Sequence, residues 1–162
     1  MANDSVTITF AKLVEFLANK FLRGEVTLAE LVELDDKEIE VIFMMGHYLY
    51  NYGKYEAALR VFSILTLYKP FVSKYWRAAG AANQALKKYN EAITAYDMAL
   101  TTNFSDVISY TYRGESKLSS GAQQAGIDDL CRAVEVGRSQ PYYAQWVNRA
   151  KTLLSVRGIE KS

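Results

Sequence analysis

Apolar residues recur along this chain every three to four positions, and short turns of small or polar residues separate the apolar runs. That spacing gathers the apolar side chains of each run on one helix face. The first run, over residues 9–22, ends before Gly24, a residue that commonly stops a helix. The whole pattern divides into about nine helical segments. We therefore predict an all-α fold.

Capping residues mark several of the predicted helix starts. Thr27 with Glu30 and Asp35 with Glu38 have the spacing of a capping box, so each pair should open a helix. Pro141 suits the first turn of a last helix that runs to about residue 156. Further N-caps are expected at Ser73 and at Ser105 or Asp106. Turns are expected at residues 52–54 and 119–121.

Three glycines stand at the same point of a helix-turn-helix pattern. Gly46, Gly80 and Gly114 follow one another at intervals of 34 residues, the period of the tetratricopeptide repeat. These glycines stand at the eighth position of each repeat. A side chain at this position would hold the first helix of the repeat away from the second. The glycines therefore predict tandem repeats, each made of two closely packed helices.

Other positions step with the same period and support three repeats. The third repeat departs from the pattern at Lys117, Gly126 and Arg138, and the frame finds no glycine at Lys12 or Asn148, so we expect no fourth repeat. The fitting positions are Ile42, Met45, Leu49, Ala58, Phe62 and Pro70, then Trp76, Ala79, Ala92, Tyr96 and Ala99, then Tyr110, Leu130 and Ala133.

The repeats organise the chain as a single domain. Residues 1–36 form an N-terminal helical segment, and residues 37–156 hold repeats at 39–72, 73–106 and 107–140 with a C-terminal capping helix. Stacked repeats leave an apolar end, which a final helix must cover. The apolar residues available for this are Trp146, Val147, Leu153 and Leu154.

The first helices of stacked repeats line a concave superhelical groove. Positions 5, 9 and 12 lie beside the stripe that packs on the second helix, so they should face this groove and bind a peptide. Phe43 and Tyr50 could instead pack against the preceding short helix. The predicted binding residues are Phe43, His47, Tyr50, Arg77, Ala81, Gln84, Thr111, Glu115 and Leu118.

Composition argues against several classes of function. The 19 basic residues balance 18 acidic ones and form no dense basic run, so no nucleic-acid partner is expected. No apolar stretch reaches the roughly 18 residues of a membrane span, and the N-terminus lacks the pattern of a signal peptide. We therefore expect a cytosolic protein that does not insert into membranes.

Catalytic chemistry has little support in the sequence. His47 and Cys131 are the only histidine and the only cysteine, they lie on different repeats, and no nucleophile, phosphate-binding or metal-binding motif accompanies them. Cys131 is expected to be a packed thiol. The neighbouring carboxylates Asp128 and Asp129 are expected to mark a helix start or to lie on a solvated face. We therefore predict no enzyme activity, no cofactor and no metal site.

Four segments carry a resemblance to a known family. They read FLRGEVTL at residues 21–28, YGKYEAA at 52–58, VFSIL at 61–65 and YWRAAGAANQA at 75–85. Together with the three repeats and the domain length, they resemble the class II chaperones of bacterial type III secretion, the tetratricopeptide chaperones of translocator proteins. The resemblance covers roughly residues 10–155.

The resemblance implies a function without chemistry. Such chaperones bind hydrophobic translocator subunits in the bacterial cytosol, prevent their aggregation and early association, and hold a short proline-containing segment in the groove. The family's aromatic groove positions fall on Phe43, His47 and Tyr50, and His47 replaces an expected tyrosine. A tetratricopeptide adaptor that docks a soluble export-apparatus or regulatory protein is the alternative. The resemblance also implies a client-free homodimer through Phe10, Leu13, Phe16, Leu17 and Phe21.

Overall fold

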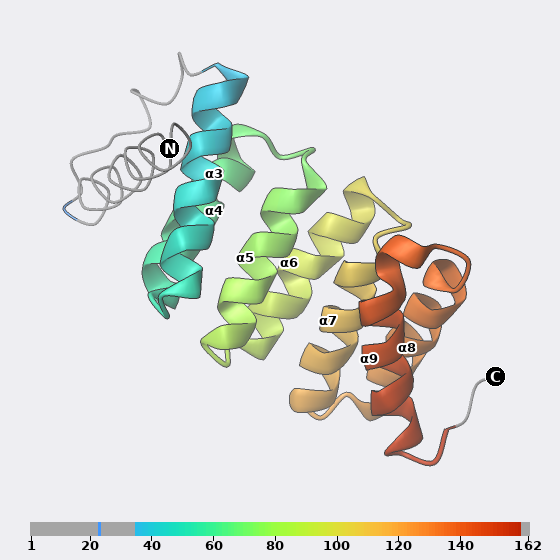
Figure 1. Cartoon of the computed structure of the whole chain (residues 1–162). Coiled ribbons are helices and arrows are strands. Elements are labelled where there is room, and N and C mark those ends of the chain that lie inside the picture. The colour runs from blue at the N-terminus through green and yellow to red at the C-terminus, as the bar shows by residue number, and fades with distance from the viewer. Residues whose placement is uncertain (1–22, 24–34, 160–162) are drawn as a thin grey trace, which may run out of the picture. The chain divides into compact units, whose positions relative to one another are not determined.

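The computed structural model describes residue 23 and residues 35–159, and these residues form helices and turns without a strand (Figure 1). The N-terminal helices predicted before residue 35, with their five dimerisation residues, lie outside the described residues. The helices are α3 (Asp36–Asn51), α4 (Tyr55–Tyr68), α5 (Ser73–Ala85), α6 (Tyr89–Thr102), α7 (Val107–Ser119), α8 (Gln123–Gly137), the 3-10 turn η1 (Pro141–Tyr143) and α9 (Ala144–Ser155).

The helices pair in the order that the repeats predict. α3 packs on α4, α5 on α6 and α7 on α8, and the second helix of each pair begins at residue 55, 89 or 123, at steps of 34 residues. The all-α fold with three tandem repeats is thus confirmed. The chain divides into two compact units, Met1–Pro70 and Phe71–Ser162, and the single-domain organisation stays a prediction.

The three repeat glycines lie where the two helices of a pair touch. A Cβ atom added to Gly80 would lie 2.7 Å from Cε1 of Tyr96, and one added to Gly114 would lie 3.0 Å from Cγ of Leu130. Such distances are shorter than ordinary carbon contacts. Phe62 occupies the same position against Gly46. The packing reason for the 34-residue glycine period is therefore confirmed in every repeat.

The third repeat has a second close contact between its two helices, at Gly126. A Cβ atom on Gly126 would lie 2.7 Å from Cγ of Leu118 and 2.9 Å from the carbonyl oxygen of Gly114. The alanine usual at this position would therefore meet backbone as well as side chain. The irregularity at Gly126 is thus a local solution to packing and leaves the repeat in register.

A left-handed residue closes the turn inside each repeat. Gly53 and Gly121 have φ values of +73° and +92°, in the turns predicted from sequence. Lys87 holds the equivalent place in the second repeat with φ +60°. A side chain in this conformation costs roughly 1–2 kcal/mol, because its Cβ crowds the next carbonyl oxygen.

Lys87→Gly should therefore stabilise the protein. Relief of the left-handed strain exceeds the flexibility that glycine adds to the unfolded chain, and we expect a net gain of about 0.5–1 kcal/mol. The melting midpoint measured by circular dichroism should rise by about 1–4 °C. Lys88→Gly is the matched control, because Lys88 has φ −84°. The account of this turn fails if both variants melt below the wild type.

Two predicted N-caps have different outcomes. Asp35 and Glu38 form the capping box: the Asp35 carboxylate accepts from the backbone N–H of Glu38 at 2.8 Å, and Glu38 accepts from that of Asp35 at 2.9 Å. The prediction for Ser73 is wrong, because Val72 is the cap residue. The Ser73 hydroxyl instead donates to the carbonyl oxygen of Ala99 at 3.0 Å, so it joins α5 to α6.

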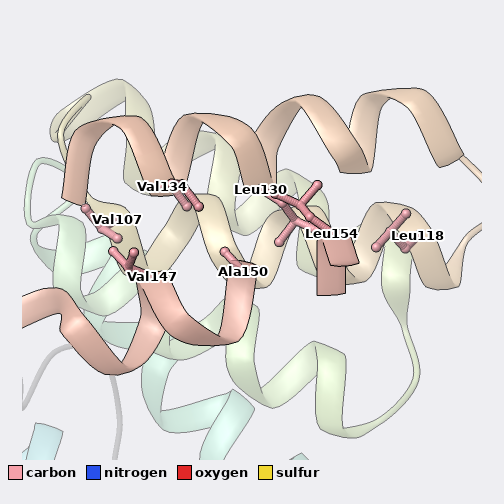
Figure 2. Packing of buried hydrophobic residues seen from close by; sticks show 8 residues of the cluster. Val107, Leu118, Leu130, Val134, Val147, Ala150 and Leu154 are labelled. Carbon is pink, nitrogen blue, oxygen red and sulfur yellow. The ribbon is translucent and has the colours of Figure 1, made fainter. Parts of the chain in front are cut away.

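The last helix covers the apolar end of the third repeat, as predicted. α9 packs against α8 and α7, and its buried residues Val147, Ala150 and Leu154 meet a cluster from those two helices (Figure 2). Trp146 and Leu153 pack at the edge of this cluster. The main chain reaches α9 through η1, so Pro141 opens a 3-10 turn rather than the helix itself.

Candidate functional site

In the unit Met1–Pro70, the predicted aromatic residues of α3 form one face, which we call the α3 aromatic face: Phe43, His47 and Tyr50. The rings of Phe43 and His47 meet edge to face with centroids 4.5 Å apart. The buried ring of Phe62 lies 5.8 Å from Phe43 and 5.4 Å from His47. Phe62 thus supports both residues from α4.

Tyr50 completes the α3 aromatic face one turn further along the helix. Its ring lies 5.2 Å from that of Tyr55, at the start of α4. Phe43 and Tyr50 are half-buried and His47 is exposed. The face therefore combines a fixed aromatic base with apolar surface that a ligand can still cover. The short helix that was considered as an alternative packing partner lies outside the described residues.

In the unit Phe71–Ser162, the predicted residues of α5 take part in polar contacts within the chain. The Gln84 side chain donates to Oε2 of Glu115 at 3.2 Å and accepts from the Tyr96 hydroxyl at 3.0 Å. Arg77 donates from Nη1 to Oδ2 of Asp106 at 2.7 Å. Ala81, between Gln84 and Arg77 on α5, is half-buried. Together these contacts fix the two polar side chains in place.

Glu115 has a partner that the sequence analysis missed. Arg149 on α9 donates from Nε to Oε1 of Glu115 and from Nη2 to Oε2 at 3.0 Å. The guanidinium also lies 5.6 Å from the centre of the Tyr112 ring. The hydrogen bonding to Glu115 raises the pKa of Arg149, so Glu115 stabilises the charged guanidinium. Residue 149 lies 34 positions after 115, so one more step of the repeat frame would have found it.

Two predicted groove residues are buried. Thr111 is fully buried, and its hydroxyl donates to the Val107 carbonyl oxygen at 2.9 Å. Leu118 is 9% exposed and belongs to the cluster beneath α9. The expectation that these two side chains face a ligand is corrected, because the last helix and the close approach at Gly126 enclose this part of α7.

Of the neighbouring carboxylates Asp128 and Asp129, only Asp129 differs from expectation. Asp128 is exposed, but Asp129 is buried. The Asp129 carboxylate accepts two hydrogen bonds from Arg113, at 2.7 and 2.6 Å, and forms an ion pair with Lys117 at 2.8 Å. Burial alone would lower the pKa of Arg113, but Asp129 and Asp97 outweigh it and the pKa is raised. Asp129 therefore ties α7 to α8.

The described residues also bear on the predictions about metal and membranes. No three histidine, cysteine, aspartate or glutamate residues come together as metal ligands among residues 35–159. In that same range, no helix has the length and apolar character needed to cross a membrane. Cys131 is half-buried at the edge of the cluster beneath α9, so the predicted packed thiol is confirmed.

The helix pairs, their glycine contacts and the terminal helix define a tetratricopeptide-repeat protein. Its sequence is 26% identical over 141 residues to the low calcium response locus protein H of Yersinia pseudotuberculosis, an alignment that covers 87% of this chain and 84% of that protein. The protein of the same name from Yersinia pestis is 25% identical over 141 residues, with the same coverage. No family model matches the sequence.

Solved structures with the same helical repeat fold superpose on this chain. PcrH from Pseudomonas aeruginosa superposes with a TM-score of 0.76 at 22% identity, covering 79% of this chain and 97% of PcrH. The type III secretion translocator chaperone SycD of Yersinia enterocolitica gives 0.74 at 24% identity, covering 81% and 98%. The fold that the resemblance to translocator chaperones predicted is therefore confirmed.

Proposed function

We propose that this protein is a bacterial cytosolic chaperone that binds a hydrophobic translocator of type III secretion and prevents its aggregation and premature association. The main support for this proposal is the α3 aromatic face, a fixed apolar surface at the predicted groove positions. Similar proteins have been solved with client segments: PcrH with the chaperone-binding regions of PopD and PopB, and SycD with a peptide of the translocator YopD.

The proposed client contacts lie on first helices of the repeats, and each of the two units carries its own set. Phe43, His47 and Tyr50 would take the apolar side chains of a short proline-containing segment. Thr111 and Leu118 are left out because they are buried. The remaining contact residues are Arg77, Ala81 and Gln84. Glu115, also predicted from sequence, is enclosed and holds Arg149 in place.

The expected binding free energy is suited to holding a client segment reversibly rather than to catalysing its reaction. Three apolar anchors contribute about 1.5–3 kcal/mol each, and ordering a flexible client segment consumes much of that gain. A micromolar affinity results unless a further contact surface adds to it. The protein would therefore hold its client reversibly, without catalysis. Turnover of a substrate that His47→Ala abolishes would contradict this part of the proposal.

The proposal includes a homodimer in the client-free state. SycD has been crystallised as an alternative dimer, and this chain carries a surplus of apolar residues between Phe10 and Phe21. Covering such a patch favours association of two copies. Deletion of residues 1–22 should therefore halve the mass measured by light scattering. An unchanged mass would exclude this segment as the dimer contact.

Affinity capture from the native cells tests what kind of partner the protein binds. We expect the tagged chain to retain an aggregation-prone, membrane-inserting protein, identified by mass spectrometry. An export-apparatus component or a regulator recovered in its place would favour the alternative, a tetratricopeptide adaptor for a soluble partner. The capture should be repeated with Phe43→Ala plus Tyr50→Ala, because loss of the partner from this variant locates the contact on the α3 aromatic face.

A further inference from the structure

Two arginines in the unit Phe71–Ser162 cover the acids with which they pair. The side chain of Arg77 is 32% exposed, whereas that of its partner Asp106 is 1% exposed. The side chain of Arg149 is 55% exposed, and that of Glu115 is 11% exposed. In both pairs the negative charge is enclosed by protein and the positive end meets solvent.

The buried carboxylate of Asp106 is fully used within the chain. Its Oδ2 accepts from Arg77 and, at 2.8 Å, from the Ser109 hydroxyl. Its Oδ1 accepts from the backbone N–H of Ile108 at 3.1 Å as the N-cap of α7. A ligand therefore meets the guanidinium of Arg77 rather than the acid behind it.

Glu115 is held in the same way at the other arginine. Its two oxygens accept from Nε and Nη2 of Arg149, and Oε2 also accepts from Gln84. Gln84 is itself fixed by the hydroxyl of Tyr96. A continuous chain of hydrogen bonds thus runs from α6 through α5 and α7 to α9, so Arg149 is positioned before any ligand arrives.

The exposed guanidinium of Arg149 keeps donors for a ligand. An arginine carries five N–H donors in a planar fork. Arg149 uses Nε and Nη2 on Glu115, and within the described part of the chain its Nη1 makes no hydrogen bond. A positioned guanidinium with free N–H groups is suited to a carboxylate, because charge-assisted hydrogen bonds are the strong ones.

We infer that the face formed by Arg77, Gln84 and Arg149, called here the arginine face, binds an acidic stretch of the client. This inference rests on the proposed function and adds a second recognition element to the apolar anchors. Arg149 makes the principal contact, since it is the more exposed of the two arginines. The positive charge of the arginine face would favour client segments that carry acidic residues over other apolar segments that the α3 aromatic face alone would bind.

Charge substitutions at Arg149 test the inference against the client recovered by affinity capture. The probes are overlapping fluorescent peptides of that client, and for each bound peptide a twin with its Asp and Glu replaced by Asn and Gln. Arg149→Gln should weaken binding of the acidic peptides roughly tenfold, as expected for one charge-assisted hydrogen bond. Arg149→Lys keeps the charge but loses the planar fork that Glu115 holds, so it should recover only part of the affinity. Lys151→Gln is the matched control, an exposed cation lost from the same helix.

A double-mutant cycle decides whether the effect is direct. The amide twin should bind the wild-type protein about tenfold more weakly than the acidic peptide does. Arg149→Gln should not weaken binding of the twin any further. Equal losses for Arg149→Gln and Lys151→Gln would overturn the inference, as would Arg149→Gln weakening the twin as much as its parent. Peptides that bind through Phe43 and Tyr50 but ignore Arg149 would overturn this inference alone, whereas no bound peptide at all would overturn the proposed function with it.

Discussion

Gly80→Leu is expected to lower the melting midpoint by roughly 4–8 °C, an effect of about 2 kcal/mol in a chain of this size. A Cβ atom at residue 80 would lie 2.7 to 2.9 Å from three carbons of the Tyr96 ring. Tyr96 is fully buried and its hydroxyl is bonded to Gln84, so the ring has no space to move. Overpacking of this kind costs about 3 kcal/mol, and the better helix propensity of leucine returns about 1 kcal/mol.

Ala85→Leu is the matched control for this prediction. It adds a leucine to the same helix at a half-buried position and should leave the midpoint almost unchanged. Thermal unfolding followed by circular dichroism measures both variants. Equal midpoints for Gly80→Leu and the wild type would show that α5 and α6 can separate without cost, which contradicts the packing reason for the repeat period.

The fold could be predicted from the sequence because its packing repeats. Gly46, Gly80 and Gly114 mark close contacts that recur every 34 residues, and local patterns such as the Asp35 capping box set helix starts. Ser73 was misassigned because its hydroxyl has two uses. It can cap its own helix or bond to α6, and only the tertiary structure selects the second.

The candidate site could be predicted only in part. Helix periodicity places Phe43, His47 and Tyr50 on one face. In the structure the rings of Phe43 and His47 meet, and the ring of Tyr50 packs against Tyr55. Periodicity cannot tell how deeply the next helix encloses a position, so it missed the burial of Thr111 and Leu118.

Sequence periodicity also could not predict the ion pairs between helices. Asp129 looks like a surface residue until Arg113 and Lys117 are seen to enclose it.

Replacing both Phe43 and Tyr50 by alanine is expected to weaken client binding about 100-fold or more. Each truncated aromatic anchor removes about 1.5–3 kcal/mol of apolar contact with the client, and every 1.4 kcal/mol is a factor of ten. The fold should survive, because both side chains are only half-buried and the rings that they contact, Phe62 and Tyr55, stay in place. Helicity and melting midpoint should therefore remain close to those of the wild type.

The matched control removes another aromatic pair from the same helix end. The rings of Tyr48 and Tyr52 are tilted against each other with centroids 4.4 Å apart, and both residues lie outside the α3 aromatic face. Tyr48→Ala plus Tyr52→Ala deletes as much aromatic surface without touching the proposed anchors, so client affinity should change by less than about threefold, the scale of a contact outside the interface.

The central claim is that the α3 aromatic face holds the client, and calorimetric titration of the purified client segment into the two double variants tests it most directly. The account predicts a Kd raised about 100-fold for Phe43→Ala plus Tyr50→Ala and nearly wild-type binding for Tyr48→Ala plus Tyr52→Ala. Wild-type affinity in the first variant, with its helices intact by circular dichroism, would contradict the claim and move the client to another surface.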